Sequence, residues 1–113
     1  MRILSIMTLD PAKASGPPSD EKIAVMGAFI EEMRAKGVLV DTGGVMPDML
    51  EMRIERSGDS YSITDGPFAE AKEFVGGYAL MDIASRDEAI ALTRRFLDIV
   101  GNATCHLHEV SVA

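Results

Sequence analysis

The chain has 113 residues, of which 47% are hydrophobic and 26% are charged, ordinary values for one globular domain covering residues 1–113. The 18 acidic and 11 basic residues give a formal net charge of −7, which repels phosphate backbones and anionic lipid and excludes nucleic acid as an expected partner. No apolar run is long enough for a membrane span or a signal peptide, so we expect a cytoplasmic protein that does not contact a membrane.

The first part of the chain has the pattern of a strand, a helix and a second strand. Arg2 to Leu9 is rich in Ile, Leu and Met, which favours a strand. Ser19 precedes two acidic residues and predicts the N-cap of a helix that ends at Gly37. The apolar residues of this helix recur at spacings of three and four: Ile23, Met26, Ile30 and Met33. Val38 to Thr42 then predicts a strand that Gly43-Gly44 breaks or bends.

A hairpin is predicted next. Met52 to Arg56 and Tyr61 to Thr64 are short and polar, and they flank the turn sequence Ser57-Gly58-Asp59-Ser60. Two such runs around a Gly-containing polar turn are typical of a β-hairpin.

The last part of the chain repeats the strand, helix and strand of the first. Tyr78 to Ile83 predicts an apolar strand after Gly76-Gly77. Ser85 and Glu88 form a capping-box sequence at the start of a helix that Gly101 ends, and Thr104 to Val112 predicts the final strand. The hairpin is therefore an insertion between two halves of the same design.

Two strand–helix–strand units that share one sheet predict a ferredoxin-like α+β fold, with an antiparallel four-stranded sheet and both helices on one face. The first strand is apolar on both faces, because Ile3 and Met7 alternate with Leu4 and Ile6. A sheet that is apolar on both faces needs cover on both. We therefore expect a homodimer in which two sheets stack and enclose a cavity.

The segment Thr64 to Phe68, followed by Glu70, Lys72 and Glu73 and then by Gly76-Gly77-Tyr78, resembles the DGPF-motif branch of the YCII-related family. The similarity covers nearly the whole chain. The resemblance implies a dimeric α+β barrel in a superfamily that includes small-molecule enzymes. It also implies an Asp/His pair proposed as catalytic in relatives, of which Asp65 is the matching acid, although no His lies near the motif in this chain.

Asp65 has two interpretations that the sequence leaves open. An Asp before Gly66-Pro67 is a common turn opener, because its carboxylate accepts hydrogen bonds from nearby backbone N–H groups. The same rigid corner would also present the carboxylate at the mouth of a cavity, where partial burial raises a carboxyl pKa and suits it to general acid/base catalysis. The two interpretations are compatible.

His106 and His108 are two positions apart in the final strand, so both point to one face of the sheet. They are read first as surface or interface histidines, with an imidazole beside a carboxylate such as Asp65 as the catalytic alternative. A metal site lacks further ligands at suitable spacing, and we expect neither a bound metal nor a cofactor. The single Cys105 excludes an internal disulfide and is read as a small buried thiol.

Four further residues complete the candidate site. Phe68, Lys72 and Glu73 follow Asp65 and are read either as a solvated edge or as contacts to a polar substrate. Tyr78 follows two glycines that permit close approach of a ligand, and its alternative is a core tyrosine with a satisfied hydroxyl.

The leading hypothesis is a small-molecule-binding protein that uses Asp65 as a general acid/base, with the reaction unspecified. The alternative is a non-catalytic binding or regulatory module whose partner is a protein. The resemblance supplies one example of such a partner, an extracytoplasmic-function sigma factor. An open pocket favours the first hypothesis, and a filled barrel with an exposed apolar patch favours the second.

Overall fold

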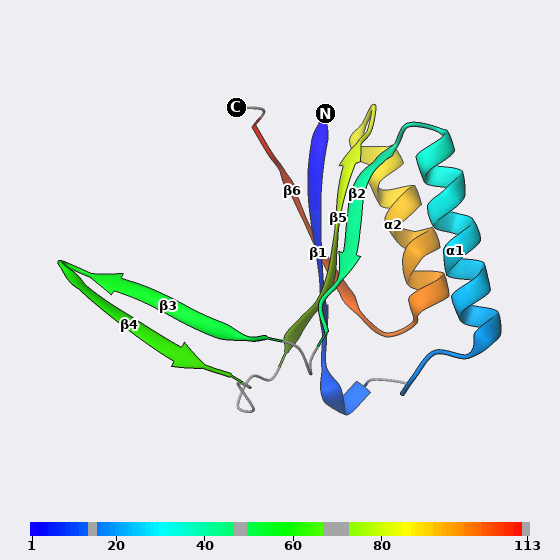
Figure 1. The fold of residues 1–113 in the computed structure, drawn as a ribbon. Coiled ribbons are helices and arrows are strands. Elements are labelled where there is room, and N and C mark those ends of the chain that lie inside the picture. Colours follow the sequence, from blue (N-terminus) through cyan, green and yellow to red (C-terminus); the bar gives the residue numbers. More distant parts are fainter. Residues whose placement is uncertain (14–15, 47–49, 67–72, 112–113) are drawn as a thin grey trace.

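A computed structural model describes residues 1–13, 16–46, 50–66 and 73–111, which Figure 1 shows as a ribbon. The elements in chain order are β1 (Arg2–Leu9), a short 3-10 helix (Pro11–Lys13), α1 (Asp20–Ala35), β2 (Leu39–Gly44), β3 (Met52–Ser57), β4 (Ser60–Asp65), β5 (Phe74–Asp82), α2 (Arg86–Val100) and β6 (Thr104–Glu109). The expected mixed α+β class, with an antiparallel sheet and two helices, is confirmed.

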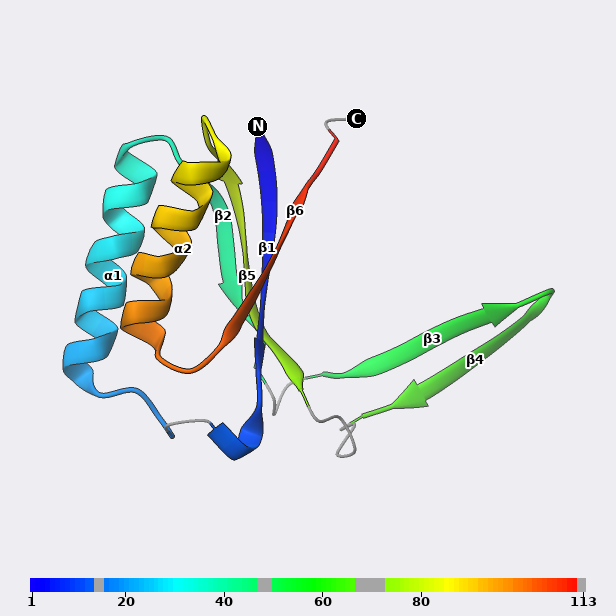
Figure 2. The ribbon, with the colours of Figure 1, turned by 180° about the vertical axis from the view of Figure 1, so that it is seen from behind.

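The main sheet contains four antiparallel strands in the order β2-β5-β1-β6, and β3 and β4 form a separate two-stranded sheet. Both helices lie on one face of the main sheet, and the β3–β4 hairpin projects on the opposite side (Figures 1 and 2). This is the strand order that two strand–helix–strand halves adopt when they share one sheet. The inserted hairpin leaves that order unchanged.

Both helices begin and end where their sequences predict. The hydroxyl oxygens of Ser19 and Ser85 each accept a hydrogen bond of 3.2 Å from the backbone N–H three residues later. The Glu88 carboxylate accepts a bond of 3.1 Å from the backbone N–H of Ala84, one residue earlier than in a standard capping box. Gly101 closes α2 with a φ of 94°, a conformation that favours glycine.

Gly43 and Gly44 belong to β2, which corrects the expectation that the strand ends at Thr42. The ring of Tyr78 lies against Gly43, since a Cβ on Gly43 would come within 2.9 Å of the Tyr78 Cε1 atom. A Cβ on Gly77 would come within 2.9 Å of the Gly43 carbonyl oxygen. The glycines therefore continue the ladder by allowing a close approach of β2 and β5 that other residues would prevent.

Two other strands differ in length from the prediction, because their common neighbour β1 sets their ends. β5 begins at Phe74, four positions before the expected Tyr78, where it pairs with Leu9. β6 ends at Glu109, opposite Ile3, although the sequence pattern continues to Val112. Val112 itself lies outside the described residues.

The hydrophobic core is small and lies near the beginning of β1. Its buried cluster consists of Ile3, Met81, Ile83 and Ala89. Met33 of α1 is also buried, with 4% of its surface exposed. No described side chain is completely shielded from solvent. Packing therefore closes only one end of the space between helices and sheet.

The helices are joined to each other by an ion pair on their outer surface. Arg95 of α2 donates a hydrogen bond of 2.7 Å to a carboxylate oxygen of Glu32 in α1, and Lys36 pairs with the same oxygen at 3.3 Å. The Arg95 guanidinium also lies 4.9 Å from the centre of the Phe29 ring. These contacts hold the Glu32 pKa at about 2, first through the hydrogen bond from Arg95.

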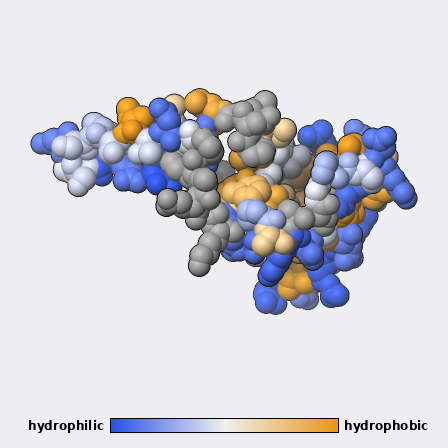
Figure 3. All heavy atoms as spheres, turned by 90° about the horizontal axis from the view of Figure 1, so that it is seen from below, coloured by the Kyte–Doolittle hydropathy of each residue, from blue (hydrophilic) through white to orange (hydrophobic). Residues whose placement is uncertain are grey.

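The β3–β4 hairpin has one apolar and one polar face, and every one of its strand residues is exposed. Ile54 pairs with Ile63, and the neighbouring pairs on that face are Met52–Asp65 and Arg56–Tyr61. The opposite face carries Arg53, Glu55, Ser62 and Thr64. Figure 3, seen from below, shows apolar atoms on the surface of the hairpin and of the adjoining end of the body.

Candidate functional site

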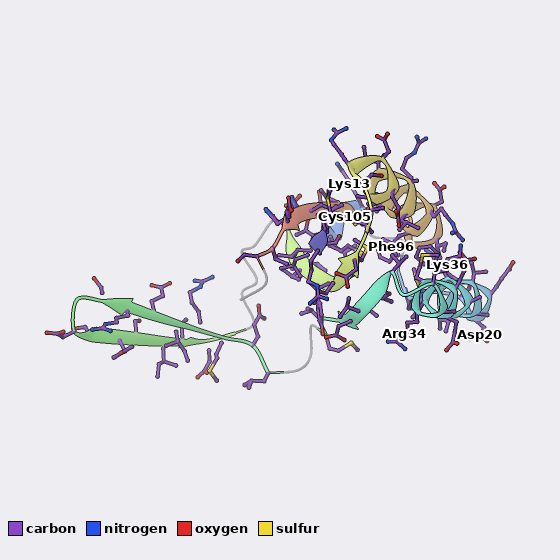
Figure 4. The ribbon with its side chains drawn as sticks, turned by 90° about the horizontal axis from the view of Figure 1, so that it is seen from above. Lys13, Asp20, Arg34, Lys36, Phe96 and Cys105 are labelled. Atoms are coloured by element: carbon purple, nitrogen blue, oxygen red, sulfur yellow. The ribbon has the colours of Figure 1, made fainter. Side chains whose placement is uncertain are left out.

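A cavity of about 800 Å³ lies between the helices and the sheet. Phe96 of α2 and Cys105 of β6 both border it, and Figure 4 shows them between the helix layer and the sheet, whereas Asp20 and Arg34 lie on the outer side of α1. Its volume is within the range of about 300–1,000 Å³ that is usual for small-molecule pockets. The cavity is therefore large enough to hold a ligand.

Several of the residues that border the cavity are small. Gly27 of α1 borders it, and a Cβ at this position would meet no atom within 4 Å. Ala79 and Gly77 of β5 border it from the sheet. Larger apolar side chains form the remaining wall, among them Met7, Met26, Phe29, Ile30, Leu92 and Phe96. The wall is therefore mainly apolar.

A few polar groups interrupt this wall. Ser5 is buried, with 7% of its surface exposed, and it lies beside the half-buried Cys105. Burial raises the pKa of the Cys105 thiol, and a hydrogen bond with Ser5 opposes this effect. A thiol with a raised pKa is protonated at neutral pH and is a weak nucleophile. Cys105 therefore fits the small-thiol interpretation and not covalent catalysis.

Two of the predicted site residues share the other face of the main sheet, which the helices leave open, and one of them, Tyr78, also borders the cavity. Tyr78 and His106 are both paired with Ile6, one on each side of it. The Tyr78 hydroxyl donates to the Asp41 carboxylate at 3.2 Å, and the His106 Nε2 lies 3.2 Å from the Thr8 hydroxyl. The hydrogen bond to Asp41 raises the pKa of Tyr78 above its ordinary value.

His108 lies on the same open face, opposite Leu4, and both histidines are exposed. The expectation that the two imidazoles share one face is confirmed by their pairing with Leu4 and Ile6. Among the residues that the structure describes, no three His, Cys, Asp or Glu side chains gather in a way that could hold a metal ion.

Asp65 is separate from this group. It is the last residue of β4 and pairs with Met52 on the apolar face of the hairpin. Its exposed carboxylate forms no hydrogen bond or ion pair with Tyr78, with either histidine or with any other described residue. A single copy of the chain therefore places Tyr78 and His106 on one sheet face, on either side of Ile6, and does not join Asp65 to them.

The remaining predicted residues are divided between the described and undescribed parts of the chain. Phe68 and Lys72 lie outside the described residues. Glu73 is exposed immediately before β5. Sequence reasoning missed Asp41 and Thr8, the partners of Tyr78 and His106. In the sequence, Asp41 and Thr8 are recognisable only as polar residues of predicted strands. Which polar residues of two strands meet depends on the pairing of segments that are far apart in the chain.

The cavity also borders Lys22, which was not predicted as a site residue. Its ammonium donates a hydrogen bond of 2.8 Å to the carbonyl oxygen of Val100, the last residue of α2. No helix in the described part of the chain has the length and apolar character needed to cross a membrane.

Comparison with known proteins gives a family and a distant relative. The family model described as "YCII-related domain" matches residues 1–96. An uncharacterised protein of Rhizobium meliloti (strain 1021) is 34% identical over 71 residues, which are 63% of this chain. The match covers 54% of that protein's own length, so the chain spans about half of this relative.

Proposed function

The chain belongs to the YCII-related domain family, and from that premise we propose that it binds a small organic molecule in the cavity between its helices and its sheet. The observation that carries the proposal is the cavity itself, which has a volume of about 800 Å³ and a mainly apolar wall. A concave apolar site with a few polar groups is the usual form of a ligand pocket. Within the family, the segment Asp65-Gly66-Pro67-Phe68 favours the DGPF-motif branch.

The experiment uses N-phenyl-1-naphthylamine, a neutral probe whose fluorescence rises in apolar surroundings. The Gly27→Leu variant places a larger side chain where a Cβ meets open space, so it fills the cavity from α1. Leucine also has a higher helix propensity than glycine, which supports folding of the variant. We expect the dissociation constant of the probe to rise at least tenfold.

The matched control is Ala28→Leu, at an exposed position of the same helix that does not border the cavity. This variant should bind the probe like the original chain. Equal binding by Gly27→Leu and the original chain would contradict the proposal, and circular dichroism would establish that both variants are folded.

A second candidate function involves the open face of the sheet. Leu4, Ile6 and Leu80 lie only half-buried there. The hairpin, which has an apolar face of its own, lies on the same side of the molecule as the open face (Figures 1 and 2). A hairpin of two strands is marginally stable alone, and an apolar sheet face favours association. We propose that two copies stack through this face as a homodimer.

Such a dimer gives Asp65 a role that a single copy does not support. The hairpin extends away from its own sheet and can therefore contact a second copy, and in the proposed dimer Asp65 at its base faces Tyr78 and His106 of that copy. In this arrangement Asp65 serves as the general acid/base for a ligand held between the copies. The test needs a ligand that the original chain converts. If the Asp65→Asn variant binds and converts this ligand as well as the original chain does, Asp65 is not the general acid/base.

The dimer is tested by size-exclusion chromatography with light scattering at micromolar concentration. Leu80→Lys should produce monomers, because it places a charge in the apolar contact, and Ala91→Lys on the exposed side of α2 should not. A monomeric original chain would contradict the dimer and would favour an unrelated protein as the partner of the open face.

A further inference from the structure

The charges around the cavity are distributed differently from those of the chain as a whole. The chain carries 18 acidic and 11 basic residues. Of the described residues that border the cavity, Lys22 is the only charged one. A cation that shares a cavity wall with no carboxylate creates a positive potential inside that cavity, and low-dielectric walls strengthen the potential. This acidic protein therefore presents a positive charge to its apolar cavity.

Lys22 lies at one end of the cavity, in the first turn of α1 and next to the end of α2. Its hydrogen bond to the Val100 carbonyl oxygen fixes the position of the ammonium group. An ammonium group has three donors, and this bond uses one of them. Asn102 also borders the cavity and follows the end of α2 by two residues. A neutral polar side chain therefore lies near the same end of the cavity as the cation.

The acidic residues nearest to Lys22 do not neutralise it by direct pairing. Glu21 and Asp98 share a hollow on the outer surface with Lys22, but neither borders the main cavity. Lys22 forms no ion pair with a described carboxylate. The charge of the ammonium is therefore available to a ligand that enters from this end.

We propose that the cavity takes an amphipathic monocarboxylate, whose apolar body lies along the cavity and whose carboxylate is bound by Lys22. This inference rests on the proposed binding function and adds the chemical class of the ligand. An apolar chain matches the wall of Met, Phe, Ile and Leu side chains, and a carboxylate matches the one cation among the described lining residues. Charge-assisted hydrogen bonds of this kind are stronger than neutral ones.

The experiment compares decanoate with decanol, which have the same chain length and differ in the charge of the head group. Each is titrated directly by calorimetry and by displacement of N-phenyl-1-naphthylamine at pH 7.5. We expect decanoate to bind at least about tenfold more tightly than decanol, since a hydrogen bond to a charged group contributes that much. Decyltrimethylammonium, with the opposite charge, should bind more weakly than decanol.

Variants of Lys22 test the assignment of the head group. Lys22→Met should make decanoate and decanol bind equally, and Lys22→Arg should preserve the preference for decanoate. Lys22→Gln keeps a donor for the Val100 carbonyl without the charge, so it should behave like Lys22→Met even if that variant folds poorly. Lys13→Met, outside the cavity lining, is the control and should change neither affinity.

The results separate the two proposals. Equal affinities for decanoate and decanol in the original chain would overturn the head-group assignment and leave ligand binding in the cavity intact. Absence of binding by decanoate, decanol and the neutral probe would overturn both. A preference for decanoate that survives in Lys22→Gln would also overturn the assignment, because the charge would then come from another residue.

Discussion

The main sheet and the β3–β4 hairpin are both antiparallel, yet they reach very different degrees of burial. The main sheet has helices on one face and contributes Ile3 and Met81 to the core, which Ile83 joins immediately after β5. The hairpin pairs Ile54 with Ile63, and these side chains are 60% and 66% exposed. Backbone pairing and a turn sequence therefore suffice to define a hairpin, whereas burial of its apolar face requires another surface.

The largest expected effect comes from comparing the truncation of a core isoleucine next to the main sheet with that of an isoleucine in the hairpin. Ile83→Ala should lower the free energy of unfolding by about 3 kcal/mol at any protein concentration, because its buried site lies within one chain. Ile63→Ala should change it by less than about 0.5 kcal/mol at concentrations where the chain is monomeric. Urea denaturation over a range of protein concentrations measures both.

The concentration dependence decides what covers the hairpin. A loss for Ile63→Ala that grows with protein concentration would support burial against a second copy. A large loss that is independent of concentration would contradict the exposure of Ile63 in the single chain.

A smaller loss of stability is expected when the close contact between β2 and β5 is disturbed. The two strands of the hairpin have no contact of this kind through a glycine. Gly77→Ala should cost about 1–3 kcal/mol of stability, because its Cβ would lie 2.9 Å from the Gly43 carbonyl oxygen. Gly44→Ala is the matched control, because the nearest atom to its Cβ is at 4.0 Å. Equal melting temperatures for the two variants would show that the strands separate easily.

The ion pair between the helices should make a contribution to stability that depends on pH, and no such contribution is expected from the hairpin. The folded chain lowers the pKa of Glu32 from 4.5 to about 2, so the stabilisation is complete above pH 4.5 and is lost as the pH falls through about 2. The original chain should be slightly more stable than Glu32→Gln at pH 6, and the difference should shrink between pH 4.5 and 2. Because the pair is exposed, the difference should be small.

Glu31→Gln on the same helix is the control for that titration, since Glu31 forms no ion pair with a described residue. Its stability should follow that of the original chain across the same pH range. A difference between Glu32→Gln and the original chain that persists unchanged down to pH 2 would contradict the link between Glu32 and Arg95.

The smallest effect concerns the two tyrosines, one in each region. The pKa of Tyr78 in the main sheet is raised above 10.0 by its hydrogen bond to Asp41. In a Tyr61→Phe background, ultraviolet absorbance reports Tyr78 alone, because the sequence contains two tyrosines. Asp41→Asn should lower the pKa of Tyr78 toward 10.0. An unchanged titration curve would show that the pair does not persist in solution.

Sequence patterns predicted the order of the elements because each pattern is local. Ser19 and Ser85 cap their helices as expected, and Gly101 ends α2. The strand ends were predicted less well, because β1 determines where β5 and β6 stop pairing. The candidate site was predicted in part. Tyr78 and His106 share a face as strand periodicity requires, while the role of Asp65 remains a prediction.

The sequence by itself determined the α+β class, the helix boundaries and the two-sided apolar character of the strands, since propensity, capping and periodicity act within a few residues. Only the tertiary structure decided which polar groups meet and where space is left. Tyr78 binds Asp41 and Lys22 binds the end of α2 across long stretches of sequence. The cavity depends on how closely the helices approach the sheet, which is a property of packing that no local pattern encodes.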